Sequence, residues 1–193
     1  NMLKNVSFLG LGVMGFPMAG YLAKAGFSTC VYNRTASKAD DWQTQQPSTA
    51  HTSTASTPAL AVADAQVVCM CLGNDDDVRS VVYGDAGVLA NMPAGSILID
   101  HTTGSQTLAL ELAQACRARN IGFIDAPVSG GQVGAETGQL TIMCGANAED
   151  YECTKPVLDV YSRHHQLIGD VGAGQLAKMM NQICIAGIVQ GLS

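Results

Sequence analysis

Residues 5–15 read NVSFLGLGVMG, a short apolar segment that runs directly into three closely spaced glycines. The apolar segment predicts a β-strand, and the residues after it have helical spacing. Gly10, Gly12 and Gly15 follow the GxGxxG pattern: the first allows a tight turn, the second lets backbone approach a pyrophosphate, and the third lets helix pack on strand. The helix N-terminus offers its N–H groups to the phosphates. We expect a dinucleotide to contact these glycines together with Leu11, Val13 and Met14; the alternative is a purely structural glycine turn.

Outward from this turn, apolar strands and helical segments alternate along the chain. AQVVCMCL (65–72) and SILID (96–100) are continuous apolar runs, as in parallel strands that are covered on both faces. The alternation predicts an α/β fold with a doubly wound, Rossmann-like, mostly parallel sheet. After Pro127 the pattern changes to a glycine-rich loop over residues 128–138 and two more strands. We expect these strands to run antiparallel at the sheet edge.

The last segment, Gly174–Ser193, is apolar almost all the way round, so it predicts a helix that must be buried. We therefore divide the chain into a dinucleotide-binding domain, residues 1–172, and the start of an interdomain helix, residues 173–193. A further domain or a second subunit is expected to cover that helix.

Composition excludes several classes of function. The 193 residues carry a formal net charge of −6 without Lys/Arg clusters, which argues against binding to nucleic acid or anionic membranes. No apolar stretch approaches the length of a membrane span. The seven cysteines are odd in number and have no CxxC spacing, so they indicate reduced thiols and a cytoplasmic location. No Cys/His pair has zinc-ligand spacing, and no metal site is expected.

Asn33, Arg34 and Thr35 follow the second expected strand, where a site that prefers NAD places a carboxylate for the ribose 2′-hydroxyl. A carboxylate repels a 2′-phosphate, whereas Arg34 can pair with one and Thr35 can donate a hydrogen bond. The pattern therefore favours NADP(H). In the alternative, Arg34 stacks on the adenine and either cofactor binds.

Two other loops are expected at the carboxyl edge of the sheet, where ligands of this fold bind. Cys71, Leu72 and Gly73 follow one strand and would contact the cofactor. Thr103, in the loop after the next strand, would reach the nicotinamide end. A capped helix start explains that second loop equally well.

The glycine-rich loop and the final helix hold the expected substrate site. Ser129, Gly130 and Gly131 can present N–H groups and a hydroxyl to a carboxylate, although a plain turn has the same spacing. Lys178, Asn181 and Gln182 stand at i, i+3 and i+4, on one face of an otherwise apolar helix. The alternative for Lys178 is a side chain whose ammonium group reaches water.

Together these motifs resemble the β-hydroxyacid dehydrogenase family, which includes 3-hydroxyisobutyrate dehydrogenase, tartronate semialdehyde reductase and the glyoxylate/succinic semialdehyde reductases. GLGVMGFPMAGYL, NRT, DHTTGS, DAPVSGGQVGAETGQLTIMCG and GAGQLAKMMNQ occur in the family's order and spacing. The resemblance implies that Lys178 is catalytic and that Ser129, Gly130 and Gly131 bind the substrate carboxylate. It also implies that Asn181 stands at a substrate-orienting position, with Gln182 as its neighbour in the site.

The same resemblance implies a helical C-terminal domain that forms much of a dimer interface, with this chain ending inside the helix that leads to it. Gly73 stands where many members of the family have proline.

These observations predict an oxidoreductase that transfers a hydride between NADP(H), or NAD(H), and a small β- or γ-hydroxy acid or semialdehyde. Lys178 would act as general acid and base. The predicted partner is a small carboxylate substrate, with a second copy of the chain as a homo-oligomer. Two alternatives stay open: a non-catalytic dinucleotide-binding module, and an imine reductase on the same scaffold.

Overall fold

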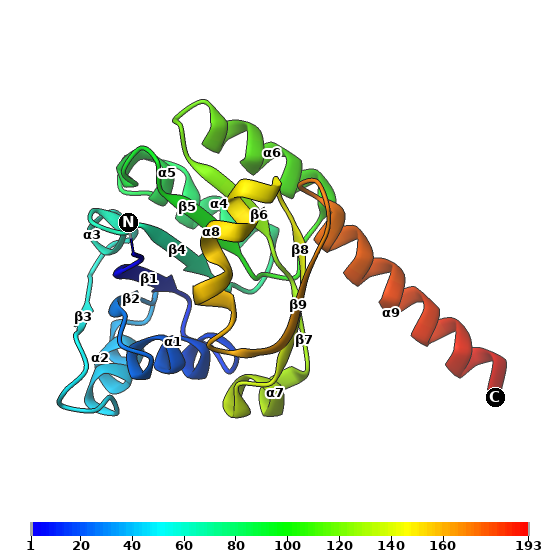
Figure 1. The fold of residues 1–193 in the computed structure, drawn as a ribbon, viewed down its shortest axis with the longest axis horizontal. Helices are drawn as coiled ribbons and strands as arrows, with labels where there is room; N and C mark the ends of the chain where they lie inside the picture. Colours follow the sequence, from blue (N-terminus) through cyan, green and yellow to red (C-terminus); the bar gives the residue numbers. More distant parts are fainter. Residues whose placement is uncertain (1, 193) are drawn as a thin grey trace.

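The computed structural model describes residues 2–192, and over that range its strands form one nine-stranded sheet (Figure 1). The strand order is β3-β2-β1-β4-β5-β6-β8-β7, with β9 paired to β8. The bounds are β1 (Asn5–Leu9), β2 (Ser28–Tyr32), β3 (Thr52–Thr54), β4 (Val67–Met70), β5 (Ile97–Asp100), β6 (Gly122–Asp125), β7 (Val128–Ser129), β8 (Leu140–Gly145) and β9 (Ser162–Gly169). Strands β1 to β6 are parallel, which confirms the doubly wound α/β fold.

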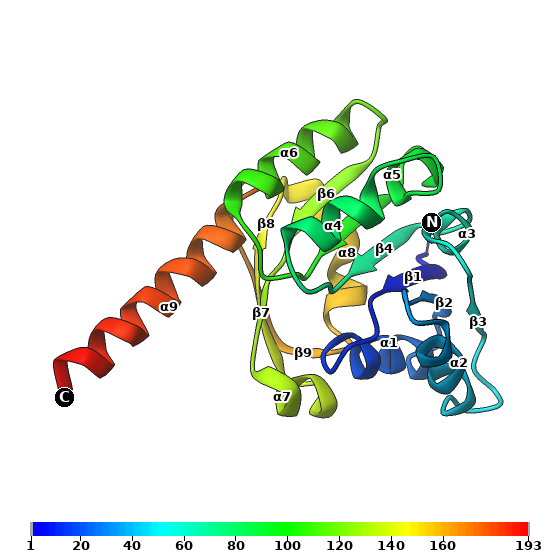
Figure 2. The same ribbon diagram turned by 180° about the vertical axis from the view of Figure 1, so that it is seen from behind.

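Helices cover both faces of this sheet. One face packs against α1 (Gly15–Lys24), α2 (Ala36–Thr44), α7 (Gly131–Thr137) and α8 (Ala148–Leu158). The other packs against α3 (Pro58–Val62), α4 (Asp75–Val82), α5 (Val88–Asn91) and α6 (Gln106–Arg117), which lie nearest the viewer in Figure 2. Alternate residues of β4 enter different cores, Val67 and Cys69 on the first face and Val68 and Met70 on the second. The strand is apolar at every position because helices cover both faces of the sheet and exclude water.

The edge strands run as expected. Strand β8 is antiparallel to β6, and β9 is parallel to β8, so both oppose the direction of β1 to β6. The expectation of a loop over residues 128–138 is wrong, because that segment contains β7 and α7. Gly138, with φ +66°, ends α7 in the left-handed conformation typical of helix C-termini. Glycine content obscured the helix in the sequence.

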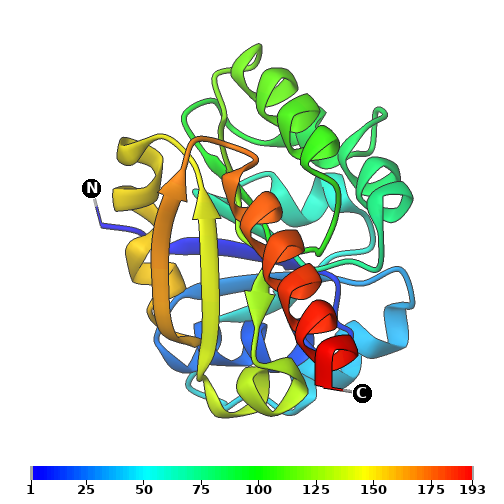
Figure 3. The same cartoon turned by 90° about the vertical axis from the view of Figure 1, so that its right-hand side faces the viewer.

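The last helix, α9 (Ala173–Leu192), starts after β9 and leaves the body of the domain (Figure 1). Figure 3 looks at the domain from the side toward which α9 projects, and the contacts of this helix are with β8, β9, β6 and α6. Its first turns are buried or half-buried, whereas Met179–Gly187 are exposed. The expected helix also included Ser193 and the side chains of Ile188, Val189 and Leu192, which lie outside what the structure describes. The domain boundary at residue 172 stays a prediction.

The carboxyl ends of the central strands meet at one edge of the sheet, which positions the site. Gly10 follows β1, Cys71 follows β4, His101 follows β5 and Ala126 follows β6. Sheet register places Asp100 of β5 directly beside Asp125 of β6. This edge is where ligands bind in open α/β sheets.

Candidate active site

The glycine turn after β1 needs its three glycines for three different reasons. Gly10 has φ +96°, and a Cβ there would collide with the carbonyl oxygen of Cys71. A Cβ on Gly15, the first residue of α1, would collide with the carbonyl oxygen of Gly10. A Cβ on Gly12 would meet no protein atom within 4 Å. Gly10 and Gly15 are therefore required by the fold, and Gly12 leaves open space beside the start of the helix.

A cavity of about 670 Å³ lies against this turn. Leu11 does not line it, because its side chain is buried and its N–H donates to Asn33 Oδ1 at 2.9 Å. Thr103 is exposed in the loop after β5 and does not line it either. The other expected cofactor residues do line it: Gly10, Gly12, Val13, Met14, Gly15, Asn33, Arg34, Thr35, Cys71, Leu72 and Gly73.

Asn33 has a second role that the sequence did not reveal. Its side-chain oxygen holds the glycine turn through Leu11, and its Nδ2 donates to the carbonyl oxygen of Thr35 at 3.1 Å. One amide therefore ties the end of β2 to the turn after β1. This contact fixes the backbone on both sides of the cavity.

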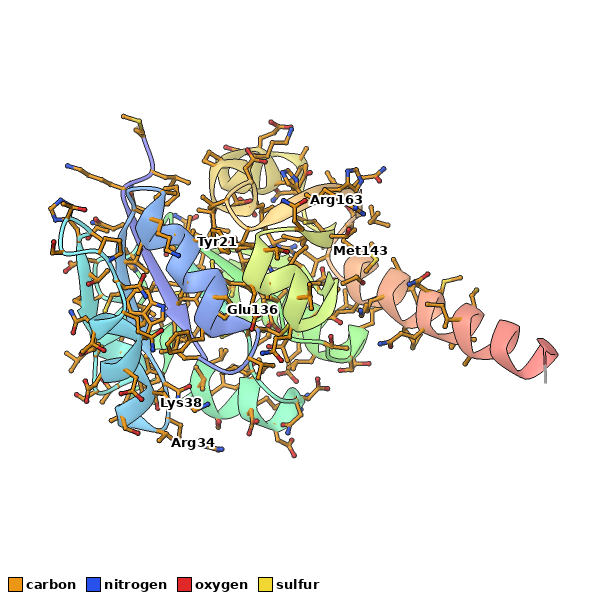
Figure 4. All side chains as sticks on the ribbon, turned by 90° about the horizontal axis from the view of Figure 1, so that it is seen from below. Tyr21, Arg34, Lys38, Glu136, Met143 and Arg163 are labelled. Atoms are coloured by element: carbon orange, nitrogen blue, oxygen red, sulfur yellow. The ribbon has the colours of Figure 1, made fainter. Side chains whose placement is uncertain are left out.

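Part of the cavity wall was not predicted from the sequence. Lys38 of α2 lines it four residues after Arg34, which precedes the helix, and Figure 4 shows both cations at the same end of the molecule. Its place close after Arg34 in the sequence was the available signal. Asp77 of α4 also lines the cavity, and its Oδ1 lies 3.9 Å from Arg34 Nη1. The cavity is therefore lined by two basic side chains and by one carboxylate that pairs with Arg34.

The lysine of α9 reaches the glycine-rich segment. Lys178 Nζ donates to Ser129 Oγ and to the carbonyl oxygen of Val128, both at 3.0 Å. Gly130 and Gly131, with φ +123° and +60°, turn the backbone from β7 into α7 beside this contact. The structure thus brings together two expected motifs that are 49 residues apart. Lys178 is half-buried and bonded to protein, rather than extended into water.

Asn181 and Gln182 follow Lys178 on α9, and both are exposed. They share its face by helical spacing.

A contact between helices links the two parts of the site. The hydroxyl of Tyr21, on α1, donates to the carbonyl oxygen of Glu136, on α7, at 2.6 Å (Figure 4). Helix α1 begins at the cofactor turn, and α7 begins at Gly131. The two expected binding segments are thus packed through their helices.

Buried titratable groups lie beneath the site. Burial raises the pKa of Asp100 to about 7, against the hydrogen bond that its carboxylate accepts from Thr102 N–H. Burial also lowers the pKa of His101 to about 4. His101 Nδ1 donates to the carbonyl oxygen of Ala126 at 2.7 Å, and Nε2 accepts from the Tyr161 hydroxyl at 2.6 Å. This arrangement satisfies a neutral imidazole.

Cys71 lines the cavity as a neutral thiol, because burial raises its pKa to about 12. A thiol of this kind is a poor nucleophile.

Residues 2–192 contain neither a group of metal ligands nor a membrane-spanning helix. No three His, Cys, Asp or Glu side chains there are grouped so as to hold a metal ion. Within the same range, no helix has the length and apolarity needed to cross a membrane.

Comparison with known families agrees with this geometry. Residues 5–172 match the family described as the NAD-binding domain of 6-phosphogluconate dehydrogenase. The match runs from β1 to the turn before α9 and includes the glycine turn and the cavity.

Individual relatives share nearly all of this chain. An uncharacterized oxidoreductase of Shewanella frigidimarina is 52% identical over 99% of the chain and 64% of its own length. The NAD-dependent L-serine dehydrogenase of Pseudomonas aeruginosa is 35% identical over 98% of the chain and 62% of its own length. The solved structure of Mycobacterium tuberculosis 3-hydroxyisobutyrate dehydrogenase with L-serine has a TM-score of 0.88 and 31% identity, over 96% of this chain and 61% of that one. The chain thus spans less than two thirds of each.

Proposed function

We propose that this chain, which belongs to the family described as the NAD-binding domain of 6-phosphogluconate dehydrogenase, is part of an NADP-preferring hydroxyacid dehydrogenase or semialdehyde reductase. Its substrate would be a small β- or γ-hydroxy acid or the corresponding semialdehyde. Family membership rests on the match over residues 5–172. The substrate class, the cofactor preference and the residue roles are the proposal.

The observation that carries this proposal is the contact between Lys178 and Ser129. An ammonium group stands at the carboxyl edge of the sheet, within 3.0 Å of a serine hydroxyl on a glycine-rich segment. Such a segment can bind one end of a small carboxylate through N–H groups and the hydroxyl. The lysine is then placed to act on the other end.

In the proposed mechanism, Ser129, Gly130 and Gly131 bind the carboxylate, while Asn181 orients the reacting group. A nicotinamide dinucleotide bound in the cavity supplies the hydride chemistry. Lys178 Nζ donates a proton to the oxygen of the carbonyl as it becomes an alcohol. In the oxidation direction the same nitrogen takes that proton back. Its positive charge also stabilises the developing alkoxide.

The cavity fits a dinucleotide because Gly12 leaves open backbone at the start of α1. Arg34, Thr35 and Lys38 support NADP(H) over NAD(H), since two cations and a hydroxyl are suited to a 2′-phosphate. Asp77 works against this preference through its ion pair with Arg34. The relative named as NAD-dependent shows that NAD use occurs among similar chains.

We also propose a homo-oligomer and a cytoplasmic location. Helix α9 has four large apolar side chains exposed: Met179, Met180, Ile183 and Ile185. Their exposure supports a partner surface along this helix. The cysteines are free, and five of them are buried or half-buried, which suits a reducing compartment.

The proposal is tested by replacing the lysine in the full-length protein. Glyoxylate and a panel of semialdehydes are reduced with NADPH and with NADH by the wild type, Lys178→Ala and Lys155→Ala. We expect kcat of Lys178→Ala to fall about 10²- to 10⁴-fold, the range lost with a general acid. Lys155, which pairs with Glu152 on the surface of α8, is the matched control and should leave kcat unchanged.

Each alternative has its own outcome. Turnover that survives Lys178→Ala overturns the lysine's role. Tight NADP+ binding by the wild type without turnover of any substrate indicates a non-catalytic module. Preference for an imine without a carboxylate over every semialdehyde indicates an imine reductase.

A further inference from the structure

Gln175 is a buried amide on α9, one helical turn before Lys178, and only 4% of its surface is exposed. Its Nε2 donates to the carbonyl oxygen of Thr102 at 2.7 Å. Its Oε1 accepts from Gly104 N–H at 3.1 Å. Both ends of the amide are thus bonded to the loop after β5, more than 70 residues away in the sequence.

A second anchor holds the start of the same helix. Asp125, fully buried at the end of β6, accepts from Gly172 N–H at 2.6 Å through Oδ1. Its Oδ2 accepts from Gln175 N–H at 2.8 Å. A strand residue thus caps α9, in place of the residue just before the helix. The first turn of α9 is fixed both to β6 and to the loop after β5.

The loop that Gln175 holds also contacts the cofactor cavity. Thr102 Oγ1 accepts from the N–H of Leu72, a residue that lines the cavity, at 2.9 Å. Hydrogen bonds therefore run from the cavity wall through Thr102 to Gln175. Lys178 follows three residues later on the same helix and bonds to Ser129.

We propose that Gln175 is a positioning residue, which sets where the ammonium of Lys178 stands relative to the cofactor cavity. The inference rests on the proposed function and deepens it. A helix held only by packing could rotate about its axis or slide along it by a fraction of a turn. Two directional hydrogen bonds at one side chain fix both the rotation and the position of the helix. Placement errors of about 1 Å are enough to slow a chemical step by roughly 100-fold.

The chemistry of the site calls for an amide. One partner is a carbonyl oxygen and needs a donor, while the other is an N–H group and needs an acceptor. Methionine has a similar shape and supplies neither. Ionised glutamate supplies the acceptor but places negative charge against the Thr102 carbonyl and close to Asp125. Protonated glutamic acid supplies both a donor and an acceptor, as glutamine does.

The test compares Gln175→Met, Gln175→Glu and the control Gln166→Met, an exposed position on β9, in the full-length protein. We expect Gln175→Met to lower kcat about 10- to 100-fold, with the Kd for NADP+ unchanged within about twofold. The primary isotope effect with 4-deuterated NADPH should rise, because the chemical step becomes rate-limiting. A protein that is merely part-unfolded loses active sites without changing that isotope effect.

Gln175→Glu supplies the sharper readout. Burial, together with the carboxylate of Asp125 that accepts from the backbone of this residue, raises the pKa of a carboxyl at this position. Activity relative to wild type should therefore recover as the pH falls and the new side chain becomes protonated. This pH-dependent rescue remains measurable even if Gln175→Met does not fold.

The outcomes separate this inference from the proposed function. If Lys178→Ala inactivates the enzyme but both Gln175 variants keep wild-type kcat and isotope effect at every pH, the positioning role is wrong and the proposed function stands. If Lys178→Ala retains turnover, both are overturned. Loss of kcat in Gln175→Met, with rescue of Gln175→Glu at low pH, supports the inference.

Discussion

The two ends of the proposed site are built in different ways. At the cofactor end, the glycine turn and the segment 33–38 form the cavity from neighbouring backbone and from exposed cations. At the lysine end, buried polar groups hold the site: Asp125 and Gln175 fix α9 through bonds to residues 47 to 73 positions away in the sequence. The first end depends on loop backbone and exposed side chains at the sheet edge, and the second depends on buried polar contacts.

This difference explains which features tolerate change. Exposed charges at the cofactor end interact through water and contribute little to folding. Buried polar groups at the lysine end are costly to leave without partners, so they specify a single arrangement. We therefore expect variants at the cofactor end to affect binding, except where glycine packs against backbone. Variants of the buried polar groups near the lysine should affect the free energy of unfolding and its dependence on pH.

The largest effect should separate two glycines of the same turn. Gly15→Ala places a methyl group against the carbonyl oxygen of Gly10, and we expect it to lower the free energy of unfolding by about 3 kcal/mol. Gly12→Ala meets no protein atom within 4 Å, so stability should not change. It should instead weaken NADP+ binding about tenfold or more, because the methyl group occupies cofactor space. Urea unfolding and calorimetric titration measure the two effects.

Equal loss of stability in both glycine variants would show that the fold requires Gly12 as it requires Gly15. An unchanged Kd for NADP+ in Gly12→Ala would remove the dinucleotide from this turn.

A second prediction concerns Asp100 and His101, whose pH effects oppose each other. The folded pKa of Asp100 is raised from 3.8 to about 7, so its contribution to stability is lost as the pH rises from about 4 to 7. The folded pKa of His101 is lowered from 6.5 to about 4, so its contribution is lost as the pH falls from 6.5 to about 4. Each is worth on the order of 3 kcal/mol.

Single variants should reveal these opposed slopes. The stability of Asp100→Asn relative to wild type should rise with pH between about 4 and 7, and that of His101→Gln should fall over the same window. Unfolding free energies at pH 4.5 to 7.5 measure both differences. Parallel curves for wild type and Asp100→Asn would show that this carboxyl titrates normally in the folded protein.

The smallest effect is expected from the exposed charges of the cofactor cavity. Asp77→Asn removes the carboxylate that lies 3.9 Å from Arg34, and should tighten NADP+ binding about two- to fivefold without changing NAD+ binding. Arg34→Ala and Lys38→Ala should each weaken NADP+ binding several-fold. All three effects should shrink at high salt. Equal changes for NADP+ and NAD+ would show that these side chains do not recognise the 2′-phosphate.

Much of the fold could be predicted because its signals are local. The apolar runs of β4 and β5 and the glycines after β1 specify strands and a turn within a few residues. The helix α7 was missed because its glycines are typical of loops, and it packs against Tyr21 and Leu140 from other parts of the chain. Lys38 was missed because its place in the cavity depends on where α2 begins.

The sequence by itself determined the doubly wound sheet and the glycine turn, and it singled out Lys178 as the side chain to which we assign the proton transfer. These follow from backbone conformation and from the period of apolar residues, which act over short distances. Only the tertiary structure decided that Lys178 meets Ser129, that Asp77 opposes Arg34, and that Gln175 and Asp125 fix α9 to the sheet. Hydrogen bonds between residues far apart in the chain form only when the strands assemble and exclude water, and no local pattern records them.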